Sequence, residues 1–190
     1  MSPEERVKQT WWLASALCLA VVAGCGDSNG DGETPGLGGS GGAANTPIEV
    51  TADSFDCILD GEKVRKFFVK NLAGDLAGSL AVANGEADLP YPPGTLLQLV
   101  PQEAMVKREE GFSPETRDWE FFFLEVAAEG TTIATRGAAE AENSFGLNCF
   151  ECHSAAPEND FVCETGNGCD PLTLSDMLIE AAQLGDPRCL

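Results

Sequence analysis

The chain has 190 residues and a formal net charge of −20, with 31 acidic against 11 basic side chains. Phosphate backbones and anionic lipid headgroups would repel so acidic a protein, which excludes nucleic acid as a partner. The same charge favours a protein partner with a basic patch, because opposite charges speed the encounter, although it also serves simply to keep a protein soluble.

The first residues have the pattern of a secretory signal. Arg6 and Lys8 precede an uncharged apolar run from Trp11 to Ala23. This run is short for a permanent membrane span, and its basic flank is typical of a signal peptide. We therefore expect residues 1–24 to be removed on export.

The apolar run ends in Val22-Ala23-Gly24-Cys25, which resembles the lipobox of bacterial lipoproteins. The resemblance implies that Cys25 is acylated and anchors the protein to a membrane on its periplasmic side. Residue 26 is Gly rather than the Asp of an inner-membrane retention signal, so the outer membrane is favoured. The alternative is an ordinary signal peptide, with Cys25 a free thiol.

After Cys25 the chain changes composition twice. Residues 26–46 contain eight glycines and no apolar periodicity, so residues 25–46 are predicted to form a flexible tether. The folded domain is expected to cover residues 47–190. Its length is sufficient for one domain with a hydrophobic core.

The first half of this domain reads as a sheet with a few helices. Val64, Phe68 and Leu72 recur at intervals of four residues, which predicts a helix over 62–72. Strands are predicted at 95–100, 104–107, 118–126 and 131–135, separated by turn residues. The expected fold class is α+β, an antiparallel sheet with a few helices, one of them near the C-terminus.

The strand predicted over 118–126 is apolar on both faces. Trp119, Phe121 and Phe123 alternate onto one face, and Phe122, Leu124 and Val126 onto the other. A strand of this kind is expected to lie in the centre of the domain, covered on both sides.

The eight cysteines divide by their surroundings. Cys18 leaves with the signal peptide, Cys25 is the lipidation candidate, and two belong to the motif described next. Four remain, an even number that predicts two disulfides with three possible connectivities in an oxidising compartment. The short intervening loop favours Cys163 with Cys169, which leaves Cys57 with Cys189.

Cys149-Phe150-Glu151-Cys152-His153 is a C-x-x-C-H sequence, the attachment motif of c-type haem. Two thiols on one helical turn can form thioethers with the two haem vinyl groups, and the adjacent histidine then becomes the proximal iron ligand. A redox dithiol and a zinc site are the alternatives. The motif thus predicts one covalent haem c held by Cys149, Cys152 and His153.

His153 is the chain's only histidine, so a second histidine cannot be the sixth iron ligand. Met105 and Met177 are the sulfur candidates. Met177 belongs to a helix predicted over 173–184 and capped by Thr173, where Leu174, Met177, Leu178 and Ala181 share an apolar face. Core packing of Met177 is the alternative, with the sixth position open.

Several motifs together resemble the cytochrome P-460 family, which includes the β-sheet type of cytochrome c-prime. They are PPGTLLQLV, AMVKRE, DWEFFFLEV, ATRGAAE and the late C-x-x-C-H followed by Asp160-Phe161-Val162, over about residues 91–162. The resemblance implies an antiparallel-sheet haem protein, often a homodimer, with an accessible iron. Some members cross-link a lysine to the haem. Lys107 is the candidate here, and an exposed lysine at a strand end is the alternative.

These observations lead to three hypotheses. The first is a membrane-anchored periplasmic monohaem protein that binds or converts hydroxylamine or nitric oxide, possessing an apolar wall of Phe121, Phe122 and Phe123. Its polar groups would come from Glu120, Glu125 or Arg136, for which sheet core and solvated edge are the alternatives. The second is an electron-transfer cytochrome with Met177 as axial ligand. The third is a disulfide-stapled lipoprotein without haem.

Overall fold

The computed structural model describes residues 47–164, 166, 169 and 174–189. The predicted signal peptide (1–24), lipidated Cys25, tether (25–46) and helix cap Thr173 lie outside the described residues. Within the described residues, no helix combines the length and apolar character needed to cross a membrane.

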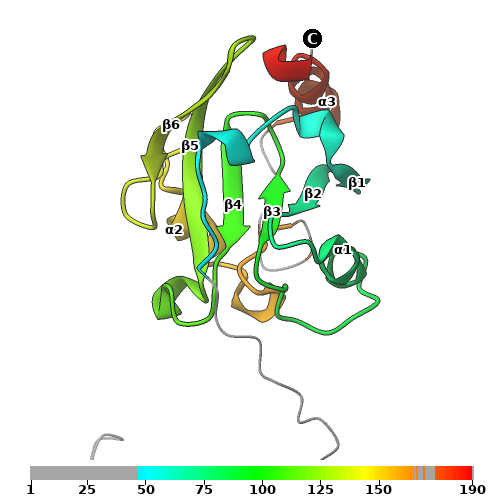
Figure 1. The fold of residues 1–190 in the computed structure, drawn as a ribbon, viewed down its shortest axis with the longest axis vertical. Coiled ribbons are helices and arrows are strands. Elements are labelled where there is room, and N and C mark those ends of the chain that lie inside the picture. Colours follow the sequence, from blue (N-terminus) through cyan, green and yellow to red (C-terminus); the bar gives the residue numbers. More distant parts are fainter. Residues whose placement is uncertain (1–46, 165, 167–168, 170–173, 190) are drawn as a thin grey trace, which may run out of the picture. The chain divides into compact units, whose positions relative to one another are not determined.

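Six antiparallel strands form one sheet in which each strand pairs with the next along the chain (Figure 1). The strands are β1 (Glu62–Val64), β2 (Phe67–Asn71), β3 (Thr95–Gln98), β4 (Glu103–Lys107), β5 (Trp119–Ala127) and β6 (Gly130–Arg136). The helices are α1 (Leu76–Ala83), α2 (Cys149–His153) and α3 (Asp176–Leu184). The predicted α+β class with an antiparallel sheet is confirmed, as are the four strands predicted after residue 94.

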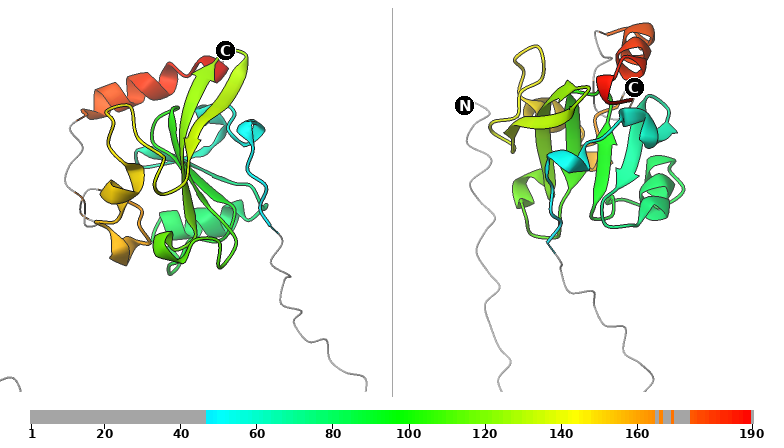
Figure 2. Two further views of the ribbon diagram at one scale, coloured as in Figure 1. Left: turned by 90° about the vertical axis from the view of Figure 1, so that its left-hand side faces the viewer. Right: turned by 45° about the horizontal axis from the view of Figure 1, so that its top comes forward.

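Both faces of the sheet are covered, as the pattern of β5 predicts. Segments after β6 lie on one face and the segment before β1 lies on the other (Figure 2). The first cluster includes Leu97, Met105, Trp119 and Phe121, together with Val162 from the later segment. The second cluster, on the opposite face, consists of Ile48, Val50, Phe55, Leu96, Ala104, Val106, Phe122 and Leu124.

The predicted helix over 62–72 is wrong, because this segment is the β1–β2 hairpin. Glu62 pairs with Val69 and Val64 with Phe67, and the turn between them places Arg65 in left-handed backbone with φ 52°. The interval of four residues between apolar positions therefore arose from two short strands on either side of a turn. The helix of this region is α1, which follows the hairpin.

Helix α3 begins later than predicted and packs through a different face. Ser175, not Thr173, is the residue before the helix, and its side chain accepts from the backbone N–H of Leu178. Ile179 and Gln183 are buried, whereas Met177 is 75% exposed. The amide of Gln183 donates to the carbonyls of Lys66 and Leu99, both at 2.7 Å. The predicted apolar face containing Met177 is therefore wrong.

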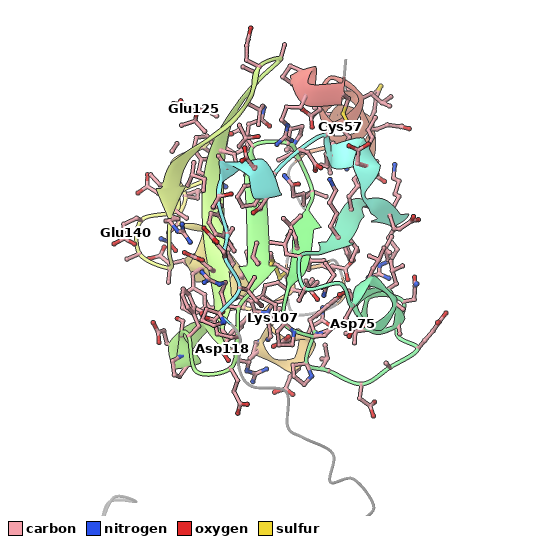
Figure 3. The ribbon with its side chains drawn as sticks, in the orientation of Figure 1. Cys57, Asp75, Lys107, Asp118, Glu125 and Glu140 are labelled. Atoms are coloured by element: carbon pink, nitrogen blue, oxygen red, sulfur yellow. A yellow bond between two sulfur atoms is a disulfide. The ribbon has the colours of Figure 1, made fainter. Side chains whose placement is uncertain are left out.

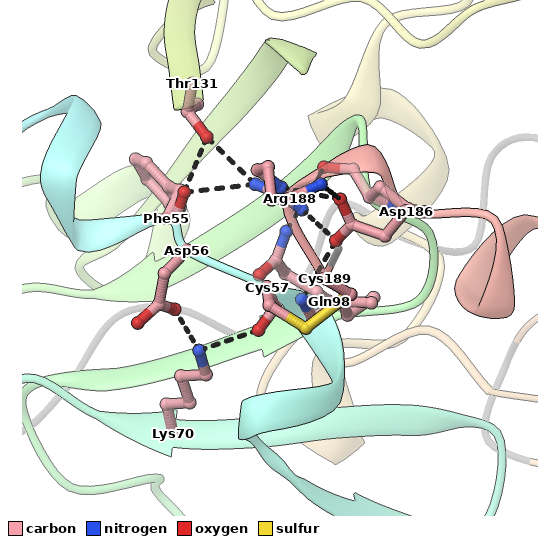
Figure 4. A network of polar contacts seen from close by, with 11 residues as sticks. Phe55, Asp56, Cys57, Lys70, Gln98, Thr131, Asp186, Arg188 and Cys189 are labelled. Carbon is pink, nitrogen blue, oxygen red and sulfur yellow. Dashed lines mark hydrogen bonds and ion pairs between the residues drawn. A yellow bond between two sulfur atoms is a disulfide. The ribbon is translucent and has the colours of Figure 1, made fainter. Parts of the chain in front are cut away.

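The predicted disulfides Cys57–Cys189 and Cys163–Cys169 are both present. Beside the first, Arg188 donates to the Phe55 carbonyl at 3.1 Å and to the Thr131 hydroxyl at 3.0 Å (Figure 4). Its partner Asp186 accepts from Arg188 at 2.6 Å and from the Ile58 backbone N–H at 2.9 Å. We call Cys57, Asp186, Arg188 and Cys189 the C-terminal clamp, since they fasten the end of the chain to the edge strand β6 and to the segment before β1.

The clamp should make stability fall in acid. Burial raises the pKa of Asp186, but hydrogen bonds from Arg188 and from backbone N–H groups outweigh burial and hold the pKa below its ordinary value of 3.8. This carboxylate therefore stabilises the fold above pH 3.8, and the contribution is lost as pH falls through the folded-state pKa. Asp186→Asn should lower the free energy of unfolding by about 3 kcal/mol at pH 7, because it leaves the buried Arg188 charge uncompensated.

Chemical denaturation between pH 7 and pH 3 would measure both effects, with a shallower acid dependence expected for Asp186→Asn than for the wild type. Asp56→Asn is the matched control, since Asp56 pairs with Lys70 at the surface and should contribute less than about 1 kcal/mol. Equal acid dependence in wild type and Asp186→Asn would contradict the assignment.

Candidate functional site

A cavity of about 420 Å³ lies on the first-cluster face of the sheet. Strand residues Leu97, Met105 and Phe121 form part of its wall, and Cys149, Cys152 and His153 of α2 form another part. Its volume falls within the range usual for small-molecule and cofactor sites. The two cysteines and the histidine of the C-x-x-C-H motif therefore line a cavity large enough for a small molecule or cofactor, and are not part of the sheet core.

Local hydrogen bonds position α2. The side chain of Asn148 accepts from the backbone N–H of Glu151 at 2.9 Å and caps the helix. Its amide donates to the Ala138 carbonyl at 2.9 Å, which ties the helix start to the segment after β6. The single turn places Cys149, Cys152 and His153 near one another, since residues three and four apart share a helix face. Both cysteines are free thiols.

The imidazole of His153 is held in one orientation. Its Nδ1 lies 2.7 Å from the Phe161 carbonyl, and its ring centroid lies 5.1 Å from that of Phe121. A carbonyl only accepts, so Nδ1 carries the proton and Nε2 keeps its lone pair. Burial lowers the pKa of His153 and outweighs the opposite effect of this hydrogen bond. The ring is thus neutral, and no residue that the structure describes hydrogen-bonds to Nε2, which leaves the form that a metal ligand requires.

The thiol of Cys149 is a poor nucleophile in this environment. Burial, followed by the charge of Glu103, raises the pKa of Cys149 to about 11. Redox C-x-x-C motifs have the opposite property, a thiolate stabilised by a lowered pKa. In this respect Cys149 differs from the reactive cysteine of a redox dithiol.

Glu103 is a cavity residue that the sequence did not single out. It lies two positions before Met105 on β4, so strand alternation places both on one face. Burial raises the pKa of Glu103, against a smaller effect from the Ser144 backbone N–H at 3.5 Å. The signal available in the sequence was this two-residue spacing from a candidate iron ligand.

The polar candidates proposed on β5 and β6 do not line the cavity. Glu120 and Arg136 do meet, with Nε of Arg136 2.7 Å from Oε1 of Glu120, but on the second-cluster face, where Arg108 also binds Glu120. Glu125 is exposed near the β5–β6 turn (Figure 3). Strand alternation explains the position of Glu120, because the neighbours of Phe121 point away from its face.

The aromatic wall is likewise smaller than predicted. Phe121 lines the cavity, whereas Phe122 belongs to the second cluster. Phe123 is partly buried beside a register shift between β5 and β6, and does not line the cavity. Three consecutive strand residues cannot share one face.

Lys107 is neither exposed nor part of the cavity wall. Its Nζ lies 2.8 and 2.9 Å from the two carboxylate oxygens of Asp160 and 2.8 Å from the Arg117 carbonyl. The predicted alternative of an exposed lysine is therefore wrong. Lys107 and Asp160 line a separate cavity of about 740 Å³.

The two methionine candidates differ sharply in position. Met105 is buried and lines the cavity together with His153. Met177 is 75% exposed on α3 and is not among the cavity residues. Met105 rather than Met177 is thus the methionine near the motif.

No family model, curated protein or solved structure matches this chain in sequence or fold.

Proposed function

We propose that this chain is an exported, membrane-tethered c-type monohaem protein that binds or converts a small nitrogen-oxide ligand, hydroxylamine or nitric oxide. The observation that carries the proposal is the arrangement of Cys149, Cys152 and His153 around one cavity, with Nε2 of His153 free. The resemblance to the cytochrome P-460 family supports the same ligand class. The two disulfides support export, because such bonds persist in oxidising compartments.

The residues present fit a haem. The thiols of Cys149 and Cys152 would form the two thioethers, and Nε2 of His153 would be the proximal ligand. Leu97, Met105 and Phe121 provide apolar walls that would exclude water from a bound haem. A haem iron supplies a binding position for small nitrogen oxides and exchanges one electron at a time.

Glu103 gives this site a proton acceptor. Its carboxylate lies in the wall of the same cavity, and its raised pKa brings it closer to neutral pH, where general bases are most effective. Oxidation of hydroxylamine removes both electrons and protons from the molecule. The electrons would pass to the haem iron and on to a redox partner protein, and a carboxylate oxygen of Glu103 would accept one proton. Glu103 thus supplies the cavity carboxylate for which Glu120 and Glu125 were the candidates from the sequence.

The second candidate function is electron transfer, and the position of Met105 favours it. A thioether sulfur in the cavity wall could occupy the sixth iron position and exclude other ligands. The net charge of −20 would then favour a redox partner with a basic patch. A second copy of the chain is a further partner implied by the family resemblance.

Titration of the reduced haem protein with carbon monoxide distinguishes these functions. With an open site, the wild type should bind readily, and Met105→Leu should change the dissociation constant by less than about threefold. Bound sulfur would have to be displaced first, so Met105→Leu would then tighten binding by about tenfold or more.

Met177→Leu is the matched control, because it makes the same substitution at an exposed position. It should leave binding unchanged in either case. If the wild type binds carbon monoxide weakly and only Met105→Leu binds it tightly, the ligand-binding function is contradicted and electron transfer is supported.

A further inference from the structure

The segment that holds His153 has an unusual backbone. Asp160 and Phe161 are consecutive non-glycine residues with positive φ, 51° and 59°. The left-handed region costs an ordinary residue about 1 kcal/mol or more, and such strain persists only where the surrounding structure imposes it. Strained positions of this kind cluster at functional sites, so the groups that impose the conformation are of interest.

Three parts of the chain hold Asp160 in place. Its carboxylate accepts from the Tyr91 backbone N–H at 3.0 Å and from Nζ of Lys107 at 2.8 and 2.9 Å. Its carbonyl accepts from Nε1 of Trp119 at 2.7 Å. The side chains of Asp160 and Lys107 are 1% and 6% exposed, so these bonds are shielded from water. Two neighbouring strands, β4 and β5, and the loop before β3 therefore fix this backbone.

The next carbonyl along the chain is the one bound to His153. Because Phe161 directly follows Asp160, the bonds that fix Asp160 also fix the direction of the Phe161 carbonyl. We infer that Asp160, Lys107 and Trp119 are positioning residues for His153, holding the Phe161 carbonyl against Nδ1 and so setting the tautomer and the ligand strength of Nε2. The part of this inference that concerns the iron rests on the proposed function, whereas the part that concerns the tautomer does not.

The expected consequence for the iron follows from ligand basicity. A carbonyl that accepts from Nδ1 makes Nε2 a stronger donor, which stabilises ferric over ferrous iron. Loosening this hydrogen bond should therefore raise the reduction potential. This effect of the hydrogen bond on the reduction potential is distinct from a direct electrostatic effect of Lys107 and Asp160. The charges of these two groups sum to zero when both are ionised.

Trp119→Phe is the cleanest test, because it removes the indole N–H and leaves every charge in place. In the full chain without haem, the tautomer of His153 can be measured by ¹⁵N NMR at pH 8. The chain has one histidine, so the imidazole nitrogen signals can be assigned to it unambiguously. The wild type should show the Nδ1–H tautomer, and Trp119→Phe a mixture of both. In the haem protein, Trp119→Phe should shift the reduction equilibrium about tenfold toward ferrous iron, about 59 mV for one electron.

Charge variants separate positioning from a Coulombic effect. Lys107→Met removes a positive charge and Asp160→Asn removes a negative one, so Coulomb effects alone would shift the potential in opposite directions. If these residues position His153, the reduction potential should rise in both variants. Lys107→Arg keeps a charged donor and should have a reduction potential close to that of the wild type. Phe122→Leu, a truncation on the opposite face of β5, controls for general destabilisation and should leave tautomer and potential unchanged.

An unchanged tautomer in Trp119→Phe, or opposite potential shifts in the two charge variants, would overturn the inference. A wild-type chain that acquires no haem would overturn the proposed function instead, and the tautomer measurement would still decide the role of these residues.

Discussion

Replacing Cys149 and Cys152 by serine should abolish haem attachment completely. Both thiols line the cavity that also contains His153, and thioethers are the covalent links that c-type haem forms there. Because thioethers survive unfolding, wild-type protein from a host with c-type haem ligation should keep its haem on a denaturing gel and stain for peroxidase activity. The Cys149→Ser/Cys152→Ser band should not stain.

Each single serine variant should retain one thioether and stain more weakly than the wild type. The control is Cys163→Ser/Cys169→Ser, which removes two cysteines of the same cavity wall that are joined to each other. This control should stain like the wild type. An unstained wild-type band would exclude the haem function and favour the disulfide-stapled lipoprotein.

Removing the Cys57–Cys189 disulfide should cause a large loss of stability. The bond links residues 132 positions apart, and the chain-entropy relation gives about 5 kcal/mol for a loop of that length. Cys163–Cys169 spans 6 positions, which corresponds to about 2 kcal/mol. Since whole domains are stable by only about 5–15 kcal/mol, Cys57→Ser/Cys189→Ser should leave a marginally folded protein.

Guanidinium denaturation of the two double-serine variants under identical conditions would measure this difference, each variant serving as the control of the other. The Asp186–Arg188 hydrogen bonds remain in both and should keep the end of the chain attached. A larger loss for Cys163→Ser/Cys169→Ser would show that local packing, not loop length, determines the contribution of each bond.

The fold was predictable from the sequence where one element carries a long, uniform pattern. The segment 118–126 carries six apolar side chains among its nine residues, on both faces of the predicted strand, and β5 matches it closely. The hairpin of β1 and β2 was not predictable, because β1 has three residues and the left-handed turn at Arg65 carries no glycine. Such short elements are stabilised by their neighbours in the sheet rather than by their own periodicity.

The candidate site was predictable only at its C-x-x-C-H motif. The spacing of Cys149, Cys152 and His153 is itself a chemical requirement, so the sequence shows it directly. Which other side chains approach them depends on the strand face, and Glu103 and Met105 reach the cavity from β4, far away in sequence. The burial of Lys107 depends on Asp160, 53 residues later, and no local pattern reveals such a pair.

The connectivity of the disulfides has a consequence for biogenesis. If the chain is exported as proposed, disulfides formed in order of emergence would join Cys57 to Cys149, the next cysteine along the chain, whereas the partner in the structure is Cys189. Six thiols allow 15 pairings, but four allow three. If Cys149 and Cys152 form thioethers with haem first, their thiols can no longer form a non-native disulfide with Cys57. Haem attachment would then limit the formation of wrong disulfides during oxidative folding. Cells without haem ligation would accumulate protein with non-native disulfides, which a disulfide isomerase would have to correct.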